Sequence, residues 1–156
     1  MTEPVAPAAP QPGLSGLEQL RAYIVAGRRP GIAVALDFNL SEISEGRAVF
    51  TGKPGLHAYN PIGSVHGGYA ATLLDSACGC AVHSKLGATQ AYTTLELKVA
   101  YHKPITAATG ELRAEGRVVT LGKRAGFAEA TLTDADGRLY ASATSTLLIM
   151  ERERPD

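Results

Sequence analysis

One stretch of the chain, residues 60–84, restricts the possible folds more than any other. It opens with turn-forming residues, passes through the sequence HGG at positions 66–68 and then becomes rich in Ala, Leu, Cys and Gly. Between His66 and Ser84 it contains one carboxylate, Asp75, and no Lys or Arg. Because a helix that is apolar around most of its circumference is normally buried, the stretch predicts a buried central helix whose N-terminus is left open for a ligand.

The segments on both sides of this helix alternate between apolar and polar residues, as half-buried strands do. Before them, residues 14–26 favour a short amphipathic helix with Ser15 as N-cap and Glu18 as its capping-box partner. Gly87 is expected to cap the end of the central helix. One antiparallel sheet must then bury that helix on one face, which is an α+β layout. Its strands are expected at residues 32–43, 47–51, 93–101, 110–121, 127–133 and 139–150.

Length and charge limit the kind of protein this is. The chain has 156 residues, the usual length of one domain. Its 15 basic and 15 acidic residues cancel, so no electrostatic field for nucleic acid is expected. The chain has no uninterrupted run of about 18 apolar residues, so no transmembrane helix is expected. We divide the chain into a flexible leader at 1–13, an N-terminal helix at 14–28, the main domain at 29–150 and a charged tail at 151–156.

The two cysteines and the leader indicate the compartment. Cys78 and Cys80 point to nearly opposite sides of the predicted helix, so they cannot pair with each other. Their spacing is not that of metal ligands, and no metal site is expected. The leader has neither the basic start nor the apolar segment of a secretory signal. We therefore expect a cytoplasmic protein with reduced thiols.

Two glycines stand at the start of the predicted helix. Backbone N–H groups at a helix start have no partner within the helix, and the helix dipole makes them electropositive. Gly67 and Gly68 remove side chains at this point, so a ligand oxygen is able to reach the amides. A carbonyl that becomes an oxyanion suits such a site. The alternative is that the two glycines only permit a tight turn or close packing.

Asp75 is the candidate general base or nucleophile. It lies eight residues after Gly67, so roughly 12 Å and roughly 80° separate the two positions on a helix. One helix therefore cannot bring both groups to one small reacting centre. If both act, the amide of one subunit must meet the acid of another, which implies an obligate dimer with the site at its interface. The alternative is a buried structural carboxylate bonded to Thr72 or to a partner's backbone.

These residues match a known pattern: Asn60, VHGG at 65–68, Leu74-Asp75 and the strand TTLELKVAYHKP at 93–104. The chain resembles the hotdog-fold acyl-CoA thioesterases over about residues 32–150. It is most similar to the phenylacetate-degradation (PaaI) type, with the Arthrobacter-type 4-hydroxybenzoyl-CoA thioesterase as a relative. The resemblance implies a curved antiparallel sheet wrapped around the long helix. It also implies a homodimer with interface active sites that assembles as a dimer of dimers.

The resemblance also implies a role for each matched residue. Gly67 would donate its amide to the thioester carbonyl, and Asp75 of the facing subunit would activate water or attack the thioester. Asn60 falls beside the thioester, and His66 shapes the pocket and orients the loop. Thr94 falls where a hydroxyl helps to hold the water, and its strand pattern places it on the polar face with Glu96 and Lys98, which fits an interface position.

Coenzyme A would be bound by cations in a loop between strands. Lys123 and Arg124 occupy this place, and two adjacent cations suit phosphate; ordinary solvated charge is the alternative. Gly68 is expected to belong to the same binding surface. The sequence leaves the acyl group open between aromatic and medium aliphatic, and the candidate lining residues for either pocket are Phe50, Tyr69, Leu73 and Tyr92. The remaining histidines, His57, His83 and His102, are expected to be structural or exposed.

The predicted reaction is hydrolysis of an acyl-CoA to a carboxylate and free coenzyme A, which needs no metal or redox cofactor. Two alternatives use the same fold. One is a non-catalytic acyl-CoA-binding module, for which no DNA-binding extension is visible. The other is a hydratase or dehydratase of enoyl or hydroxyacyl thioesters, although HGG followed by Asp75 fits the hydrolase branch better.

Overall fold

The structure is a computed structural model, and it describes residues 12–152. Most of the predicted leader and the last four residues of the predicted tail therefore lie outside the described residues. The helices are α1 (Gly16–Val25), α2 (Gly31–Leu36) and α3 (Gly67–His83), with short 3-10 turns at η1 (Leu56–Ala58) and η2 (Ala107–Thr109). The strands are β1 (Phe38–Ser44), β2 (Arg47–Gly52), β3 (Gln90–Tyr101), β4 (Leu112–Leu121), β5 (Ala125–Asp134) and β6 (Leu139–Glu151).

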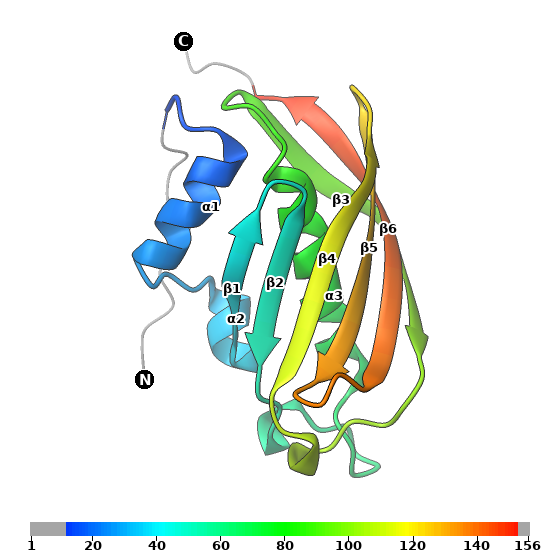
Figure 1. Ribbon diagram of the computed structural model, residues 1–156. Coiled ribbons are helices and arrows are strands. Elements are labelled where there is room, and N and C mark those ends of the chain that lie inside the picture. Colours follow the sequence, from blue (N-terminus) through cyan, green and yellow to red (C-terminus); the bar gives the residue numbers. More distant parts are fainter. Residues whose placement is uncertain (1–11, 153–156) are drawn as a thin grey trace.

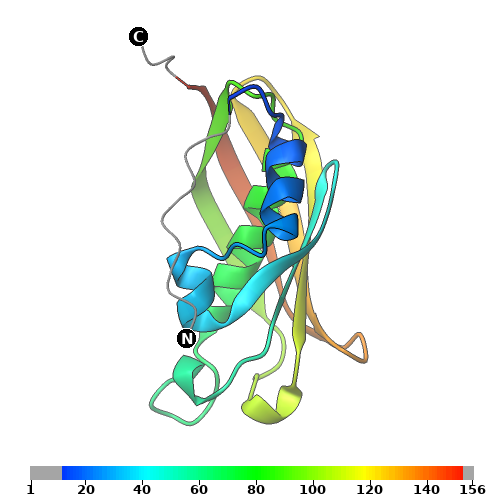
Figure 2. The same ribbon diagram turned by 90° about the vertical axis from the view of Figure 1, so that its left-hand side faces the viewer.

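One antiparallel sheet of six strands curves around α3 (Figure 1). The strand order is β1-β2-β4-β5-β6-β3, so β3 forms one edge of the sheet and β1 the other. The α+β layout with a central helix is thus confirmed. Figure 2 shows α1 and α2 on the side of α3 that the sheet leaves open.

The central helix packs tightly because its sheet-facing residues are small. Ala77 and Ala81 are fully buried. A Cβ added at Gly116 of β4 would lie 2.3 Å from the Ala77 carbonyl oxygen, so only glycine lets the sheet approach this closely. Leu73, Leu74 and Val82 fill the space on either side of this contact and are also inaccessible to solvent.

The N-terminal helix forms as its sequence predicts. The Ser15 hydroxyl accepts from the Glu18 amide, and the Glu18 carboxylate accepts from the Ser15 amide at 2.7 Å. The Ser15 amide bond holds the pKa of Glu18 below its ordinary value. The end of α3 differs from the prediction, because Ser84 and not Gly87 is its C-cap residue.

The strand predicted at 32–43 is wrong in its first half. Residues 31–36 form α2, which Pro30 starts as its N-cap residue. Asp37 then takes a left-handed conformation with φ of 55°, and β1 begins only at Phe38. Arg29 stabilises this corner, since its guanidinium donates to the carbonyls of Ala33 and Phe38 and pairs with Asp37 at 2.9 Å. The alternating pattern did not reveal a helix of six residues.

Candidate active site

The loop before α3 is ordered by the side chain of Asn60. Its Oδ1 accepts from the amides of Ile62 and Ser64 at 3.1 and 3.2 Å, and its Nδ2 donates to the Ser64 hydroxyl at 3.1 Å. The amide group is therefore engaged within its own loop. One N–H of Nδ2 has no acceptor among the described residues, and the role beside the thioester that we expected for Asn60 stays a prediction.

The segment from Val65 to Tyr69 leaves one amide without an acceptor. Val65 donates its amide to the Ile105 carbonyl at 2.8 Å, and His66 donates to Ala58 at 2.7 Å. The Gly68 amide donates to Nδ1 of His66 at 2.8 Å, and the Tyr69 amide donates to the His66 carbonyl at 2.9 Å. Within the described residues, the Gly67 amide is the only one of residues 65–69 that has no acceptor.

The two glycines therefore differ in what they do. A Cβ at Gly68 would lie 2.8 Å from Nδ1 of His66, so glycine at this position allows the imidazole to fold back over the helix start. The Gly68 amide donates to that nitrogen and is therefore not available to a ligand. Gly67 keeps its N–H available, at the electropositive end of a 17-residue helix.

Asp75 lies in the middle of α3 and is bound by Thr94. The Thr94 hydroxyl donates to Oδ1 of Asp75 at 3.0 Å. The expected position of Thr94 on the polar face with Glu96 and Lys98 is wrong, because β3 has a bulge between Thr94 and Glu96. A bulge inserts one residue and reverses the alternation. Thr94 therefore faces α3, and Leu95 is the residue left exposed.

A cavity of about 280 Å³ opens beside Asp75. Asp75, Ser76 and Cys80 of α3 form one wall, and Tyr92 and Thr94 of β3 adjoin them. The facing walls come from the N-terminal helices and the first hairpin, through Leu20, Tyr23, Ile32, Phe38, Leu40 and Phe50. Of the expected acyl-pocket residues, Phe50 and Tyr92 line this cavity. Tyr69 and Leu73 lie in the sealed core instead.

A second cavity, of about 310 Å³, lies at the N-terminus of α3. It is lined by the segment from Ser64 to Gly67, by Ala70 and by residues 101–105 at the end of β3 and beyond. The Gly67 backbone forms part of its surface. Lys103 is an exposed cation at its rim.

Lys123 and Arg124 lie in the exposed turn between β4 and β5. Figure 1 shows this turn at the opposite end of the molecule from the start of α3. One subunit thus holds the expected residues in three places. Asn60, His66, Gly67 and Gly68 share the start of α3, Asp75 and Thr94 meet at its middle, and the two cations occupy the far end.

Sequence reasoning missed a role for Tyr101, which it placed only at the end of the strand predicted at 93–101. Its hydroxyl donates to the Gly67 carbonyl at 2.7 Å. The side chains of α1 and α2 that wall the cavity were missed as well. Leu20 and Ile32 are apolar positions in the sequence, but nothing in the sequence indicates that they lie near Asp75.

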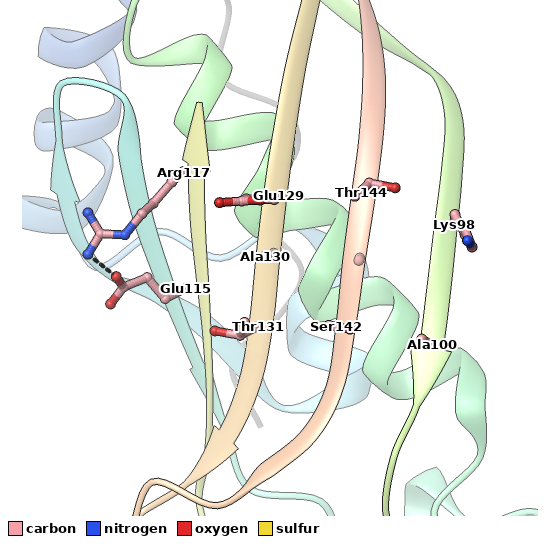
Figure 3. Close-up of a pocket in the computed structure, with 10 residues that line it drawn as sticks. Lys98, Ala100, Glu115, Arg117, Glu129, Ala130, Thr131, Ser142 and Thr144 are labelled. Atoms are coloured by element: carbon pink, nitrogen blue, oxygen red, sulfur yellow. Dashed lines mark hydrogen bonds and ion pairs between the residues drawn. The ribbon is translucent and has the colours of Figure 1, made fainter. Parts of the chain in front are cut away.

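The face of the sheet away from α3 carries a further cavity of about 480 Å³. Figure 3 shows Glu115 and Arg117 of β4 beside Glu129 of β5, with Lys98 farther along on β3. Arg113 and Arg47 bind the Glu115 carboxylate. Although partial burial opposes it, these bonds lower the pKa of Glu115 to about 2. Glu115 and its arginine partners therefore neutralise one another, and none of the expected site residues lines this cavity.

Two structural findings bear on other kinds of site. Among residues 12–152, no group of three or more His, Cys, Asp or Glu side chains is placed to hold a metal ion. In the same part of the chain, no helix has the length and apolarity needed to cross a membrane.

Several solved structures share this arrangement of helix and sheet. A thioesterase family protein from Silicibacter pomeroyi has a TM-score of 0.76 and 26% sequence identity, over 88% of this chain and 99% of that one. A thioesterase from Haemophilus influenzae has a TM-score of 0.75 and 17% identity, over 88% and 92% of the two chains. The PaaI protein of E. coli, from the phenylacetic acid degradation operon, has a TM-score of 0.72 and 23% identity, over 87% and 93%. The fold is therefore the hotdog fold.

The chain belongs to the thioesterase superfamily, which matches residues 62–141. A curated relative from Halobacterium salinarum, an esterase by name, is 46% identical over 77 residues. The match covers 47% of this chain and 49% of the relative, so the chain spans about half the length of the curated relative that it matches. The superfamily is named for thioester hydrolysis and the relative for ester hydrolysis.

Proposed function

We propose that this chain hydrolyses an acyl-CoA thioester in a homodimer whose active sites lie between the subunits. The observation that carries the proposal is the Gly67 amide, which alone among residues 65–69 has no acceptor in the described structure. It faces a cavity at the positive end of α3. An N–H group that is held in place without a partner suits an oxygen that becomes negative during the reaction.

Two subunits are required because Gly67 and Asp75 lie beside different ends of β3. Tyr101 of β3 contacts Gly67, whereas Thr94 of β3 contacts Asp75. β3 is an edge strand, so one row of its backbone groups is open to pairing. If two copies of β3 pair antiparallel around a two-fold axis near Leu97, Thr94 of one copy approaches the level of Tyr101 in the other. The Gly67 amide and the partner's Asp75 then converge.

The charges on β3 support this register. Glu96 and Lys98 flank Leu97 and are both exposed. A two-fold axis at Leu97 places Glu96 of each copy opposite Lys98 of the other, which gives two cross-strand pairs of opposite charge.

The same two-fold axis reverses the direction of the second subunit. Lys123 and Arg124 of one copy then lie at the same end as Gly67 of the other, where they would bind the coenzyme A phosphates.

The proposed reaction uses groups already in place. The thioester carbonyl oxygen accepts from the Gly67 amide. Asp75 either removes a proton from water that attacks the carbonyl carbon, or attacks that carbon itself to form an anhydride that water then opens. The C–S bond breaks, and the coenzyme A thiolate leaves and takes up the proton. Thr94 holds the Asp75 carboxylate and is near enough to orient the water.

The cavity beside Asp75 supports a compact acyl group. An engineered cavity of about 150 Å³ holds one benzene molecule, and this cavity is about 280 Å³. It therefore suits a single ring with a short linker or a medium aliphatic chain better than a long fatty acyl chain.

HGG followed by an acid nine residues after the histidine supports the phenylacetate-degradation type. Assembly as a dimer of dimers remains part of the proposal, as does a cytoplasmic location, which the unpaired Cys78 and Cys80 support.

Asp75→Asn tests the proposal. Removal of one acid-base group is expected to lower kcat by about 10² to 10⁴, while thermal unfolding shows an intact fold. Asp136→Asn, in an exposed turn, is the matched control and should keep the parent rate. Activity is measured as release of free thiol from aromatic, short-chain and medium-chain acyl-CoAs. If the Asp75→Asn variant hydrolysed acyl-CoAs at the parent rate, the catalytic role assigned to Asp75 would be wrong.

The same assay separates the two other functions. A binding module would hold acyl-CoA tightly without releasing thiol. A hydratase would change the absorbance of an enoyl-CoA double bond, again without thiol release. Either result from the parent protein would contradict the proposed hydrolysis.

A further inference from the structure

Tyr101, the last residue of β3, is fastened to the first turn of α3. Its hydroxyl donates to the Gly67 carbonyl at 2.7 Å, although the side chain is 54% exposed at the edge of the sheet. The Gly67 carbonyl is a helical acceptor already, so the hydroxyl is not needed to satisfy a buried group. The contact instead ties the edge strand to the beginning of the helix.

The Tyr101 ring also restricts the residue at position 67. A Cβ built on Gly67 would lie 3.0 Å from the Tyr101 hydroxyl oxygen and 3.1 and 3.3 Å from two ring carbons. Such contacts are tighter than nine in ten real Cβ contacts, so a side chain at this position would shift the ring by a few tenths of an ångström. The ring and the glycine are therefore matched to each other.

These contacts fix the two peptide groups that flank Gly67. The peptide after Gly67 is held at both ends, since its oxygen accepts from Tyr101 and its N–H donates to Nδ1 of His66. The peptide before Gly67 is held by its oxygen, which accepts from the Tyr69 amide at 2.9 Å. Its N–H is the free Gly67 amide and points the opposite way. Glycine backbone is otherwise unusually mobile, so this amide has a defined direction because its neighbours are bound.

We propose that Tyr101 is a positioning residue for the Gly67 amide and that its ring is the reason position 67 holds glycine. The proposal rests on the proposed function, because a fixed amide direction matters only if a reacting oxygen is bound there. A donor that is aligned in advance avoids reorganisation during the reaction. Loss of the Tyr101 hydroxyl should thus affect the reaction step more than the binding of substrate.

Tyr101→Phe tests the hydroxyl. We expect kcat to fall about threefold to tenfold, the range that corresponds to one neutral hydrogen bond, with KM unchanged. Tyr59→Phe is the matched control, because the Tyr59 hydroxyl also holds a loop, accepting from the Ala107 amide at 2.8 Å, but does not touch Gly67. An equal loss of kcat in both variants, or a change in KM alone, would overturn the proposal.

A double-mutant cycle tests the ring without any activity measurement. Gly67→Ala should affect the midpoint of thermal unfolding clearly less favourably in the parent than in a Tyr101→Ala background, because the ring is no longer there to be displaced. Equal effects in the two backgrounds would show that Tyr101 does not determine the residue at position 67. If the parent released no thiol from any acyl-CoA, the proposed function would fail, while this cycle would still decide the structural pairing.

Discussion

The two cavities beside α3 are built in different ways. The cavity at the start of the helix is lined from segments 64–70 and 101–105, which lie within the residues that match the thioesterase superfamily. Its chemical feature is a backbone amide. The cavity beside Asp75 takes most of its apolar wall from residues 20–50, outside the matched segment, and its features are side chains.

This difference indicates that separate segments of the chain determine the two cavities. The donor at Gly67 is a backbone group, so the proposed oxyanion site depends on the fold of the matched segment. The wall of the other cavity is set by side chains such as Leu20 and Tyr23, whose replacement changes the size of the space without touching α3. We infer that the reaction is specified by one part of the chain and the acyl group by another.

Gly67→Pro removes the backbone donor and should lower kcat almost as much as Asp75→Asn. Proline is favoured at the first position of a helix, and His66 has a ψ of 136°, which the residue before a proline accepts. The Cβ of the added ring would crowd Tyr101 as that of Gly67→Ala does, so Gly67→Ala, which keeps the N–H, is the matched control. We expect kcat to fall about 10² to 10³-fold, as for loss of one oxyanion donor, with helix content by circular dichroism unchanged. A variant that is folded and fully active would exclude the Gly67 amide from the reaction.

Mixing Gly67→Pro with Asp75→Asn tests whether the two groups come from different subunits. In a mixed dimer one site receives both defects and the other receives none. After unfolding and refolding of equal amounts together, half of the dimers are mixed, so about a quarter of the parent activity should return. If the two groups act within one chain, the mixture stays as inactive as its components.

The fold was largely predictable from the sequence because its main signals are local. The uncharged stretch before and after Asp75 predicted α3, and alternation predicted the strands that lie around it. The capping box at Ser15 and Glu18 likewise depends on residues three positions apart. Such features need no knowledge of distant neighbours.

The candidate site was less predictable because its geometry depends on single irregularities. The bulge after Thr94 turns this residue toward Asp75, and period-two alternation contains no sign of it. The positive φ of Asp37 separates α2 from β1, and thereby places Ile32 on the cavity. The link between Tyr101 and Gly67 joins residues 34 positions apart. Each of these depends on contacts made only in the folded chain.

Leu20→Ala should change which acyl group is preferred. It removes apolar volume from the α1 wall of the cavity, and one or two methylene groups in such a pocket are worth about tenfold in discrimination. We expect the ratio of kcat/KM for a longer over a shorter acyl-CoA to rise about tenfold. Val25→Ala is the control, since Val25 lies on the same helix but is 88% exposed and lines no part of the cavity. An equal shift in both variants would mean that α1 does not set the acyl size.

The smallest effect concerns the two thiols, which differ in access to the cavity. Burial raises the pKa of both Cys78 and Cys80 to about 12, and the charge of Asp75 adds to the shift. The reactive thiolate is therefore scarce at neutral pH, and alkylation by iodoacetamide should speed up about tenfold for each unit of pH from 8 to 10. Only Cys80 lines the cavity, whereas Cys78 is sealed in the core.

Alkylation followed by peptide mass spectrometry measures this difference in the Asp75→Asn variant, which should bind acyl-CoA without consuming it. A saturating acyl-CoA should slow the modification of Cys80 several-fold and leave Cys78 unchanged, because an acyl group in the cavity covers one thiol and not the other. Free coenzyme A, which has no acyl group, is the control and should protect neither. Protection of Cys80 by free coenzyme A would place the nucleotide part of the substrate, and not the acyl group, beside Asp75.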